Sequence, residues 1–369
     1  MGRDSQAVVT SNGPGMEGAP LLGALLAGAR LGMLDPLTRA EHLWQPFHEE
    51  LETAETFTGL DPLTATVMRL WCVGQTVPVA SVTDALDQET VAELVEARLL
   101  RRVGDDLVSP WRVITFLQRQ LLVTPPAHAV AFRPEDPVAY VGQESLFFAP
   151  FVAGAERCDR ALDVCAGAGL LSVLSPGREV VAVEVDPFAA EVARFNVVMG
   201  GHDHVSVVEG DLFGPVAGER FDLVTANPPF LPAPAGVSLP VCGDGGPTGD
   251  GVLRRLLGGL EEHLTSHGRA LVYGEDLGPA EEPGIAAWLR EDGALRERDV
   301  TVYLTSSRFN DRTALRLTDL WQACGASEED AWTAWNELTA GRPSSHHHGF
   351  IIDVRPGPGR LVVRDAEKH

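Results

Sequence analysis

The chain has 369 residues, of which 44% are hydrophobic and 22% are charged, and its formal net charge is −23. This apolar content is too high for a disordered chain, and no uninterrupted apolar window is long enough to predict a membrane span. The stretch from Leu21 to Leu34 is broken by Arg30 and follows no basic leader, which disfavours a signal peptide. We therefore expect a cytoplasmic, globular protein of two domains.

The distribution of charge disfavours a nucleic acid as partner. Lysine occurs only at Lys368, and the arginines are dispersed along the chain. Affinity for DNA or RNA comes mainly from clustered basic residues that neutralise phosphates, so only a local basic groove would permit such an acceptor. The five cysteines lack C-x-x-C spacing, and we expect small buried hydrophobic side chains rather than disulfides or a zinc site.

The N-terminal region is predicted to be mainly helical. Residues 1–20 show no periodicity and are interpreted as a disordered terminus. From Leu21 to about Val123, apolar residues recur at three- and four-residue spacing between prolines, which predicts several helices. Pro125 and Pro126 mark a domain boundary, so the first domain is expected over residues 21–125 and the second over 126–369.

Within the first domain, residues 79–110 have the pattern of a winged helix. Helices are predicted over Ser81–Leu86 and Gln88–Ala97, followed by short strands around Leu99–Val103 and Leu107–Val108. The second helix contains three glutamates and no basic residue to read bases. We interpret the segment as a packing or dimerisation module, and in the latter case the protein is a homodimer through this domain.

From Arg160 onward, short apolar runs alternate with helical stretches, which is typical of a parallel sheet with crossover helices. A helical insertion is expected over residues 306–345, because the gap before the last strand exceeds what a hairpin needs. Trp332 and Trp335 are predicted to pack the core of this cap. The predicted strands are Ala161–Val164, Val180–Val185, Val205–Glu209, Phe221–Ala226, Arg269–Tyr273, Asp299–Leu304 and Gly349–Val354.

Three successive predicted strands end in residues suited to a nucleoside. The first runs into residues 162–169 (LDVCAGAG), where glycines let backbone N–H groups approach a ligand before the next helix. Glu184 follows Asp163 by twenty-one residues, the usual distance for an acid that accepts hydrogen bonds from ribose hydroxyls. After the third strand, Asp211 can meet an adenine amino group while Leu212 covers the ring.

The fourth strand is followed by residues 227–230 (NPPF). The two prolines remove two donors and fix the turn, which leaves the Asn227 side-chain oxygen and the Pro228 carbonyl as neighbouring acceptors. Two such acceptors suit an NH₂ group, and Phe230 supplies a flat apolar face. The same residues also fit a simple loop, but their place on the fourth strand of a nucleoside-binding pattern favours a functional role.

Together these motifs resemble the class I S-adenosylmethionine-dependent methyltransferases that carry an N-P-P-F motif, especially the release-factor glutamine N-methyltransferases and the ribosomal-RNA guanine N2-methyltransferases. The resemblance covers residues 140–273 and implies an α/β, Rossmann-like fold with a seven-stranded, mostly parallel sheet. Residues 243–251 are similar to a glycine-rich stretch that these families place after N-P-P-F, at the acceptor entrance. Residues 140–146 resemble the segment before the first strand, although Gln143 is assigned no contact.

The resemblance implies S-adenosylmethionine as cofactor and S-adenosylhomocysteine as product. An acceptor nitrogen would attack the methyl carbon of the sulfonium in line, and neither a strong general base nor a metal ion is expected. The three consecutive histidines His346–His348 are expected to be exposed or locally packed and not to bind a metal. Carried over by motif, the cofactor-binding residues are Asp163, Cys165, Gly167, Gly169, Glu184, Asp211, Leu212 and Asn227, and the catalytic residues are Asn227, Pro228 and Phe230.

Three functions fit the sequence. The first is N-methylation of an amide, guanidine or amino nitrogen on a small molecule or a protein side chain, with the cap and the N-terminal domain narrowing the site. The second is methylation of guanine N2 in ribosomal RNA. The third, disfavoured by the cofactor motifs, is a non-enzymatic winged-helix regulator. The acceptor, the number of methyl groups and the oligomeric state do not follow from the sequence.

Overall fold

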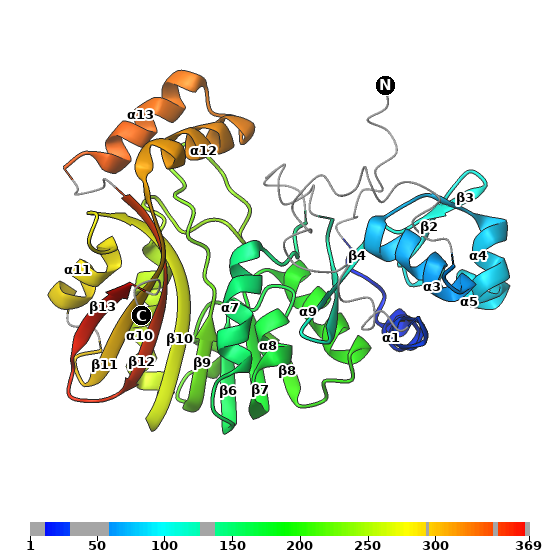
Figure 1. Ribbon diagram of the computed structural model, residues 1–369, viewed down its shortest axis with the longest axis horizontal. Helices are drawn as coiled ribbons and strands as arrows, with labels where there is room; N and C mark the ends of the chain where they lie inside the picture. The colour runs from blue at the N-terminus through cyan, green and yellow to red at the C-terminus, as the bar shows by residue number, and fades with distance from the viewer. Residues whose placement is uncertain (1–11, 30–58, 126–136, 293–294, 342–345, 366–369) are drawn as a thin grey trace.

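The computed structural model describes residues 12–29, 59–125, 137–292, 295–341 and 346–365, with side chains except at 307–311. Figure 1 shows a large twisted sheet flanked by helices, with the N-terminal elements on one side of it and two further helices above one end. Within the described residues, no helix is both long and apolar enough to cross a membrane.

The N-terminal elements contain the predicted helix–turn–helix and the two short strands. Asp87 caps the N-terminus of α5, where its Oδ1 accepts a hydrogen bond of 2.8 Å from the backbone N–H of Thr90. Strand β1 pairs antiparallel with β3, and β3 with β2, so the small sheet has the order β1-β3-β2. The bounds are η1 Met16–Gly18, α1 Ala19–Gly28, α3 Pro62–Val67, the π-helix η5 Met68–Val73, β1 Val77–Pro78, α4 Val79–Leu86, α5 Gln88–Glu96, β2 Arg101–Val103 and β3 Asp106–Val108.

Two features of this region differ from the expectation. Within the segment expected to be disordered, residues 12–20 hold η1 and the start of α1, while residues 1–11 lie outside the described part. The last segment before Pro125 is an antiparallel hairpin of β4 (Arg112–Phe116) and β5 (Arg119–Val123), not a helix. Each of these strands has three consecutive buried residues, so its sequence shows neither the helical nor the alternating pattern of apolar residues from which an element could be predicted.

Eight strands form the large sheet within the described residues, one more than the resemblance implied. All seven predicted strands are present, and the eighth, β13, pairs parallel with β11 at the edge. Strands β10, β9, β6, β7 and β8 are parallel neighbours in that order, whereas β12 runs antiparallel between β10 and β11. The bounds are β6 Cys158–Val164, β7 Gly177–Glu184, β8 Val205–Glu209, β9 Phe221–Ala226, β10 Leu264–Gly278, β11 Arg298–Phe309, β12 His346–Pro356 and β13 Leu361–Asp365.

Helices cover both faces of this sheet. Because side chains alternate along a strand, Leu271 and Tyr273 of β10 point into one apolar cluster, while Ala270 and Val272 point into another. The first cluster contains α7 (Gln143–Ala153), α8 (Leu170–Leu174) and α9 (Pro187–Met199). The second contains α10 (Gly251–His263) and α11 (Gly284–Asp292). Parallel strands covered on both sides explain the nearly continuous apolar runs in the sequence.

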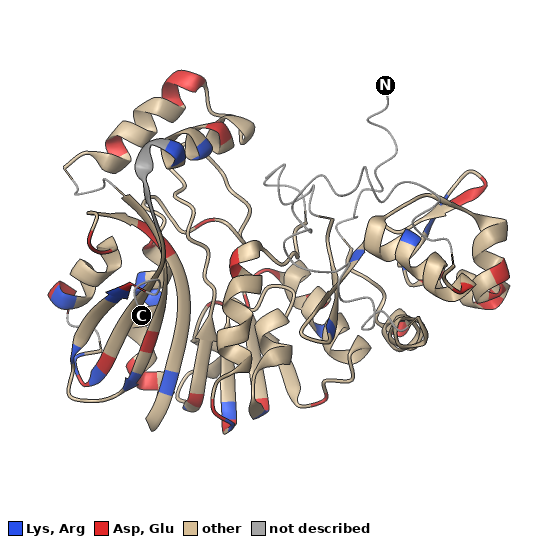
Figure 2. Cartoon of the chain, in the orientation of Figure 1, with Lys and Arg blue, Asp and Glu red and all other residues tan. Residues whose placement is uncertain are grey.

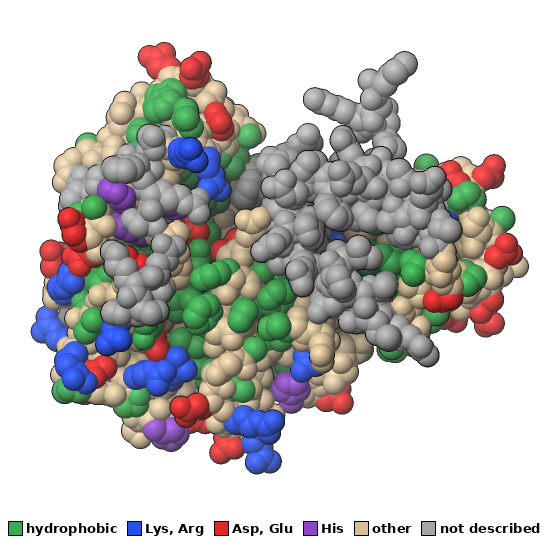
Figure 3. Space-filling view, in the orientation of Figure 1, with side chains coloured by type: hydrophobic (Ala, Val, Ile, Leu, Met, Phe, Trp, Pro, Cys, Tyr) green, Lys and Arg blue, Asp and Glu red, His purple; other side chains and the backbone are tan. Residues whose placement is uncertain are grey.

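Helix α7 is apolar on its outer face as well as its inner one. Phe148 is fully buried, whereas Phe147 and Phe151 are about half exposed and contact each other with ring centroids 5.6 Å apart. Figure 3 shows hydrophobic side chains gathered on the face of the molecule that α7 occupies in Figure 1. Hydrophobic periodicity therefore could not indicate which face of this helix is buried.

The N-terminal part and the large sheet share one core. The apolar cluster on the α7–α9 side also contains Leu22 of α1, Trp71 of η5 and Leu122 of β5. Trp111 stacks on Phe188 of α9 with ring centroids 6.0 Å apart and an interplanar angle of 12°. The sequence boundary at Pro125 is thus not a boundary between independently packed cores.

The insertion before β12 consists of α12 (Asn310–Ala323) and α13 (Glu328–Thr339). Trp321 and Trp335 are buried in a small cluster between the two helices, whereas Trp332 is 36% exposed, so the predicted core role is wrong for Trp332. Figure 2 shows acidic residues on α13 and α5, neither of which contains Lys or Arg.

Candidate functional site

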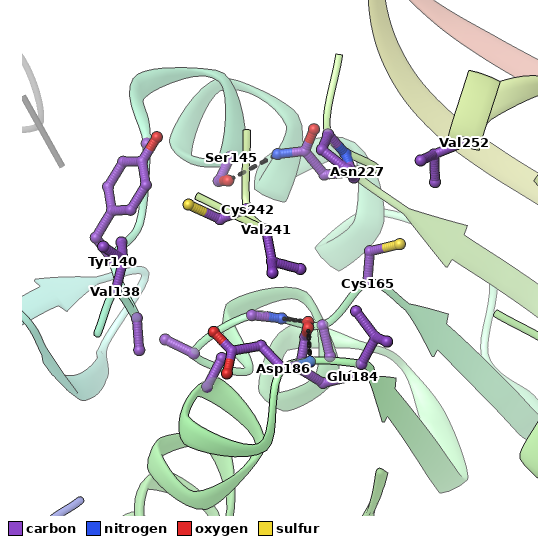
Figure 4. A pocket seen from close by; sticks show the side chains of 18 of the residues that line it. Val138, Tyr140, Ser145, Cys165, Glu184, Asp186, Asn227, Val241, Cys242 and Val252 are labelled. Atoms are coloured by element: carbon purple, nitrogen blue, oxygen red, sulfur yellow. Dashed lines mark hydrogen bonds between the residues drawn. The ribbon is translucent and has the colours of Figure 1, made fainter. Parts of the chain in front are cut away.

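A cavity of about 280 Å³ lies at the carboxyl ends of β6, β7, β8 and β9. This is the edge of an open α/β sheet at which ligands usually bind, because the loops after parallel strands meet there. Its wall also includes residues 138–142, the first turn of α7 and the segment from Leu239 to Asp244. Figure 4 shows the side chains that converge on it from these elements.

The turn after β6 brings backbone to the cavity. Cys165 and Gly167 line it and have positive φ angles of 59° and 55°. A Cβ atom added at Gly167 would meet no atom within 4 Å, so the backbone there is open to a ligand. Gly169, also predicted as a contact, has φ +90° at the start of α8 and does not line the cavity.

Asp163 lies beneath this turn, where it does not line the cavity. Its carboxylate accepts hydrogen bonds of 2.5 Å from Ser172 Oγ and 2.8 Å from Thr225 Oγ1, and the residue is fully buried. Burial raises the pKa of Asp163 to about 6, although the two hydroxyl donors act in the opposite direction. The structure therefore gives Asp163 contacts that brace the turn.

Glu184 joins the turn after β6 to the end of β7. Its Oε2 accepts a hydrogen bond of 2.7 Å from the backbone N–H of Gly167, and its Oε1 accepts one of 2.9 Å from that of Asp186. Burial raises the pKa of Glu184, while these two donors oppose the rise. Each oxygen accepts one hydrogen bond from the backbone and keeps a second lone pair that can accept a hydroxyl in the cavity.

The end of β8 supplies Asp211 and Leu212 to the cavity wall, as predicted from the motif. The Asp211 side chain is more than half exposed and forms an ion pair with Arg255. Leu212 is buried with a positive φ of 47°, which is uncommon for a residue with a Cβ atom. Such backbone conformations persist where the surrounding packing imposes them.

Asn227 projects into the site from the end of β9. Its Nδ2 donates a hydrogen bond of 2.8 Å to Ser145 Oγ in the first turn of α7. Its Oδ1 is buried and has no hydrogen-bond partner within the part of the chain that the structure describes. A buried unpaired acceptor costs free energy unless a ligand donates to it. The structure thus places an unpaired amide oxygen, with almost no solvent-exposed surface, on a residue of the cavity wall.

The other predicted residues of the N-P-P-F motif lie behind this wall. Pro229 lines the cavity, but Pro228 and Phe230 do not. The ring of Phe230 packs edge-on against Tyr273, with centroids 6.0 Å apart. Its backbone is held closely, because a Cβ atom at Gly249 would lie 2.6 Å from the carbonyl oxygen of Phe230.

The loop after the motif is also held by the glycine-rich segment and the cap. Leu231 accepts a backbone hydrogen bond from Gly245 and donates one to Gly243, both of 2.9 Å. Trp321 of α12 donates a hydrogen bond of 2.8 Å from Nε1 to the carbonyl oxygen of Pro232. Both elements that the sequence associated with the acceptor entrance therefore contact the loop that follows Asn227.

The cavity wall is acidic. Its charged residues are Glu144, Glu184, Asp186, Asp211 and Asp244, and no Lys, Arg or His lines it among the described residues. Burial, and to a smaller extent the charge of Glu275, raises the pKa of Glu144 to about 7. The expectation of buried cysteines is wrong for Cys242, which is exposed and lines the cavity, and the other four cysteines are only partly buried.

Sequence reasoning missed the contribution of α7. Glu144 and Ser145 line the cavity, whereas their neighbour Gln143 is exposed and does not. Glu144 and Ser145 belong to the segment that resembled a family element, but no spacing rule linked this segment to Asn227, which lies 82 residues after Ser145. Only the fold brings the two segments together.

The histidine run lies on β12, away from this wall. Among the described residues, no group of three or more His, Cys, Asp or Glu side chains is arranged to hold a metal ion. His347 Nε2 lies 3.3 Å from Glu275 Oε2, and His348 Nε2 lies 2.7 Å from the carbonyl oxygen of Pro279. Local contacts thus account for these side chains.

Comparison with known proteins matches the same part of the chain. Residues 145–239 match the family model of the methyltransferase small domain, and residues 46–110 match a domain described only as being of unknown function. The chain is 39% identical over 123 residues to a ribosomal protein uL3 glutamine methyltransferase of Bradyrhizobium diazoefficiens, covering 30% of this chain and 39% of the relative. It is 34% identical over 103 residues to a release factor glutamine methyltransferase of Geobacter sulfurreducens, covering 27% and 34%.

These matches confirm the predicted resemblance to class I methyltransferases of the glutamine type. The chain spans less than half the length of either relative. An S-adenosylmethionine-dependent methyltransferase of Agrobacterium tumefaciens superposes with a TM-score of 0.41 and 14% identity, covering 70% of this chain and 73% of that one.

Proposed function

We propose that this protein is an S-adenosylmethionine-dependent N-methyltransferase that acts on a side-chain nitrogen of a protein. The observation that carries the proposal is the buried Oδ1 atom of Asn227, which is unpaired among the described residues and lies beside the cavity. The names of the matched relatives, both glutamine methyltransferases, support the same chemistry.

The cavity suits this cofactor. When bound, S-adenosylmethionine supplies a methyl group on a positively charged sulfonium, and a wall with five carboxylates and no basic side chain among the described residues favours a cation. Glu184 would accept the ribose hydroxyls with its remaining lone pairs, and Asp211 with Leu212 would hold the adenine. Cys165 and Gly167 would lie along the methionine part, with Asp163 and Gly169 supporting the turn from behind.

Asn227 would orient the acceptor nitrogen. Its free Oδ1 would accept one N–H of the acceptor, which favours a pyramidal nitrogen with a localised lone pair, whereas Pro228, which does not line the cavity, would act by fixing the turn. An amide nitrogen needs this assistance because its lone pair is delocalised. Phe230 would act indirectly, by packing against Tyr273 and fixing the loop.

The charge of the wall also bears on the acceptor. A polynucleotide would have to bring phosphates close to Glu144 and Asp244, with no basic side chain on the described wall to neutralise them. A neutral amide or amine avoids this repulsion. The cap would narrow the entrance through the contact of Trp321 with Pro232.

For the N-terminal part, we infer a winged-helix-like module that serves packing rather than DNA binding. The order β1, α4, α5, β2, β3 and the small antiparallel sheet support this assignment. The acidic surface of α5 and the core shared with α9 support the packing role. Self-association through the module stays a prediction, which the mass of the protein in solution would test.

The experiment uses purified protein, tritiated methyl donor, and ribosomal protein uL3 or release factor as acceptor. Isothermal titration should detect uptake of S-adenosylhomocysteine. Asn227→Ala should leave this affinity within about threefold while reducing kcat at least a hundredfold, a loss of the size seen when one hydrogen bond to a transition state is removed. Absence of cofactor uptake would overturn the whole proposal. Uptake without methyl incorporation into either protein would overturn the protein acceptor, and unchanged turnover in the variant would remove Asn227 from the mechanism.

A further inference from the structure

We infer that Ser145 is a positioning residue that orients the side-chain amide of Asn227; this inference rests on the proposed function. The amide has an accepting end and a donating end, and rotation by half a turn about its last side-chain bond would exchange them. With the donating end toward the cavity, Asn227 would repel the N–H of an acceptor. The end of the amide that does not meet the acceptor therefore needs a contact that keeps the side chain in place.

Ser145 is placed to do this. Its Oγ lies 2.8 Å from Nδ2 and accepts a hydrogen bond from it, and the described residues provide no partner for Oδ1 on the other end. In this orientation the donating end is paired with the protein and the accepting end is left for a ligand. Because a serine hydroxyl both donates and accepts, Ser145 fixes the place of the amide, and the N–H of the acceptor selects the orientation in which Oδ1 receives it. In Figure 4 the serine and the amide face each other across the top of the cavity.

The serine is carried on a helix whose position is fixed. Leu146, Phe148 and Val152 of α7 are buried in the core that the sheet shares with the N-terminal part, and the ring of Phe148 lies 6.1 Å from that of Tyr273. A hydroxyl on such a support can hold a partner without a further loss of conformational freedom. The N-terminal part thereby contributes to the orientation of Asn227 through α7.

The test follows the Asn227 amide directly and then turnover. The chain contains five asparagines, so selective ¹⁵N-asparagine labelling gives few side-chain NH₂ signals, and Asn227→Asp identifies the one that belongs to Asn227. In the wild type, these hydrogens should exchange with solvent slowly. In Ser145→Ala their exchange should accelerate at least tenfold, and in Ser145→Thr, which keeps the hydroxyl, it should return to within about twofold.

Turnover on the protein acceptor supplies the second readout. Ser145→Ala should lower kcat about tenfold, the size expected from one neutral hydrogen bond, with KM for the acceptor and the affinity for S-adenosylhomocysteine changed less than twofold. Gln143→Ala alters the same helical turn at an exposed residue outside the cavity wall and should leave both readouts unchanged. Unchanged amide exchange or unchanged kcat in Ser145→Ala would overturn the inference. If the wild type transfers no methyl group, the proposed function fails, whereas the amide signal still decides whether Ser145 holds Asn227.

Discussion

Asn196 of α9 joins the N-terminal hairpin to the turn that lines the cavity. Its Oδ1 accepts a hydrogen bond of 2.7 Å from the backbone N–H of Leu122 in β5. Its Nδ2 donates to the carbonyl oxygens of Leu122 and Ala168, both at 2.9 Å. Because Ala168 lines the cavity, replacement of Asn196 by alanine tests whether the two parts of the protein are coupled.

The magnitude follows from the groups that the replacement leaves behind. Asn196 is fully buried, so one N–H and two carbonyl groups would lose their partner where water does not reach. Each unsatisfied buried group costs about 1–3 kcal/mol, and partial relaxation limits the total. We expect Asn196→Ala to lower the free energy of unfolding by about 3–5 kcal/mol. The affinity for S-adenosylhomocysteine should fall as well, because the turn loses one of its supports.

Urea unfolding, extrapolated linearly to water, measures the first effect, and isothermal titration measures the second. Asn336→Ala is the matched control, since Asn336 is exposed on α13 and its loss should change stability by less than about 0.5 kcal/mol. A loss below about 1 kcal/mol in Asn196→Ala would refute the reasoning. So would lower stability with unchanged cofactor affinity, because the contact to Ala168 would then be irrelevant to the cavity.

Two further predictions concern the turn and the loop around the cavity. Burial raises the pKa of Asp163 from 3.8 to about 6, so between these pH values the folded chain keeps a proton that the unfolded chain releases. The contribution of protonated Asp163 to the free energy of unfolding is therefore fully present below about pH 4 and is lost as the pH rises through about 6. Relative to Asp163→Asn, the wild type should therefore lose up to about 3 kcal/mol between pH 4 and 7, and parallel stability profiles would contradict this. Gly249→Ala should both destabilise the protein and lower turnover, because the new Cβ atom would lie too close to the carbonyl oxygen of Phe230. Gly236→Ala is the control: Gly236 has a similar φ but no atom within 4 Å of the added Cβ, so this variant should lose only the backbone strain of about 1–2 kcal/mol. Equal melting temperatures for the two variants would argue against the clash.

The sequence predicted the elements that have a strong local signal. All seven predicted strands are present, because buried parallel strands leave short apolar runs between turn residues. The residues at four strand ends could be located from spacing alone, and the sheet brings Glu184, Asp211 and Asn227 to one cavity. The helix pair of the insertion followed from the length of the gap and its periodicity.

Other features depended on contacts between distant segments. The motif placed Asp163 at a strand end, but only packing decides that its carboxylate meets Ser172 and Thr225 instead of the cavity. The hairpin of β4 and β5 has the burial pattern of neither an amphipathic helix nor a half-exposed strand, because it is covered by α9. Ser145 carries no motif of its own, and its pairing with Asn227 exists only in the folded chain.

The shared core of the N-terminal part and the α7–α9 face has an evolutionary consequence. Recombination that joined another leading module at Pro125 would leave Phe188 and Phe195 of α9 without the side chains that now cover them. Such a chimera would expose an apolar surface and would tend to aggregate. Because the two rings stack, we expect substitutions at Trp111 and at Phe188 to covary among homologous chains.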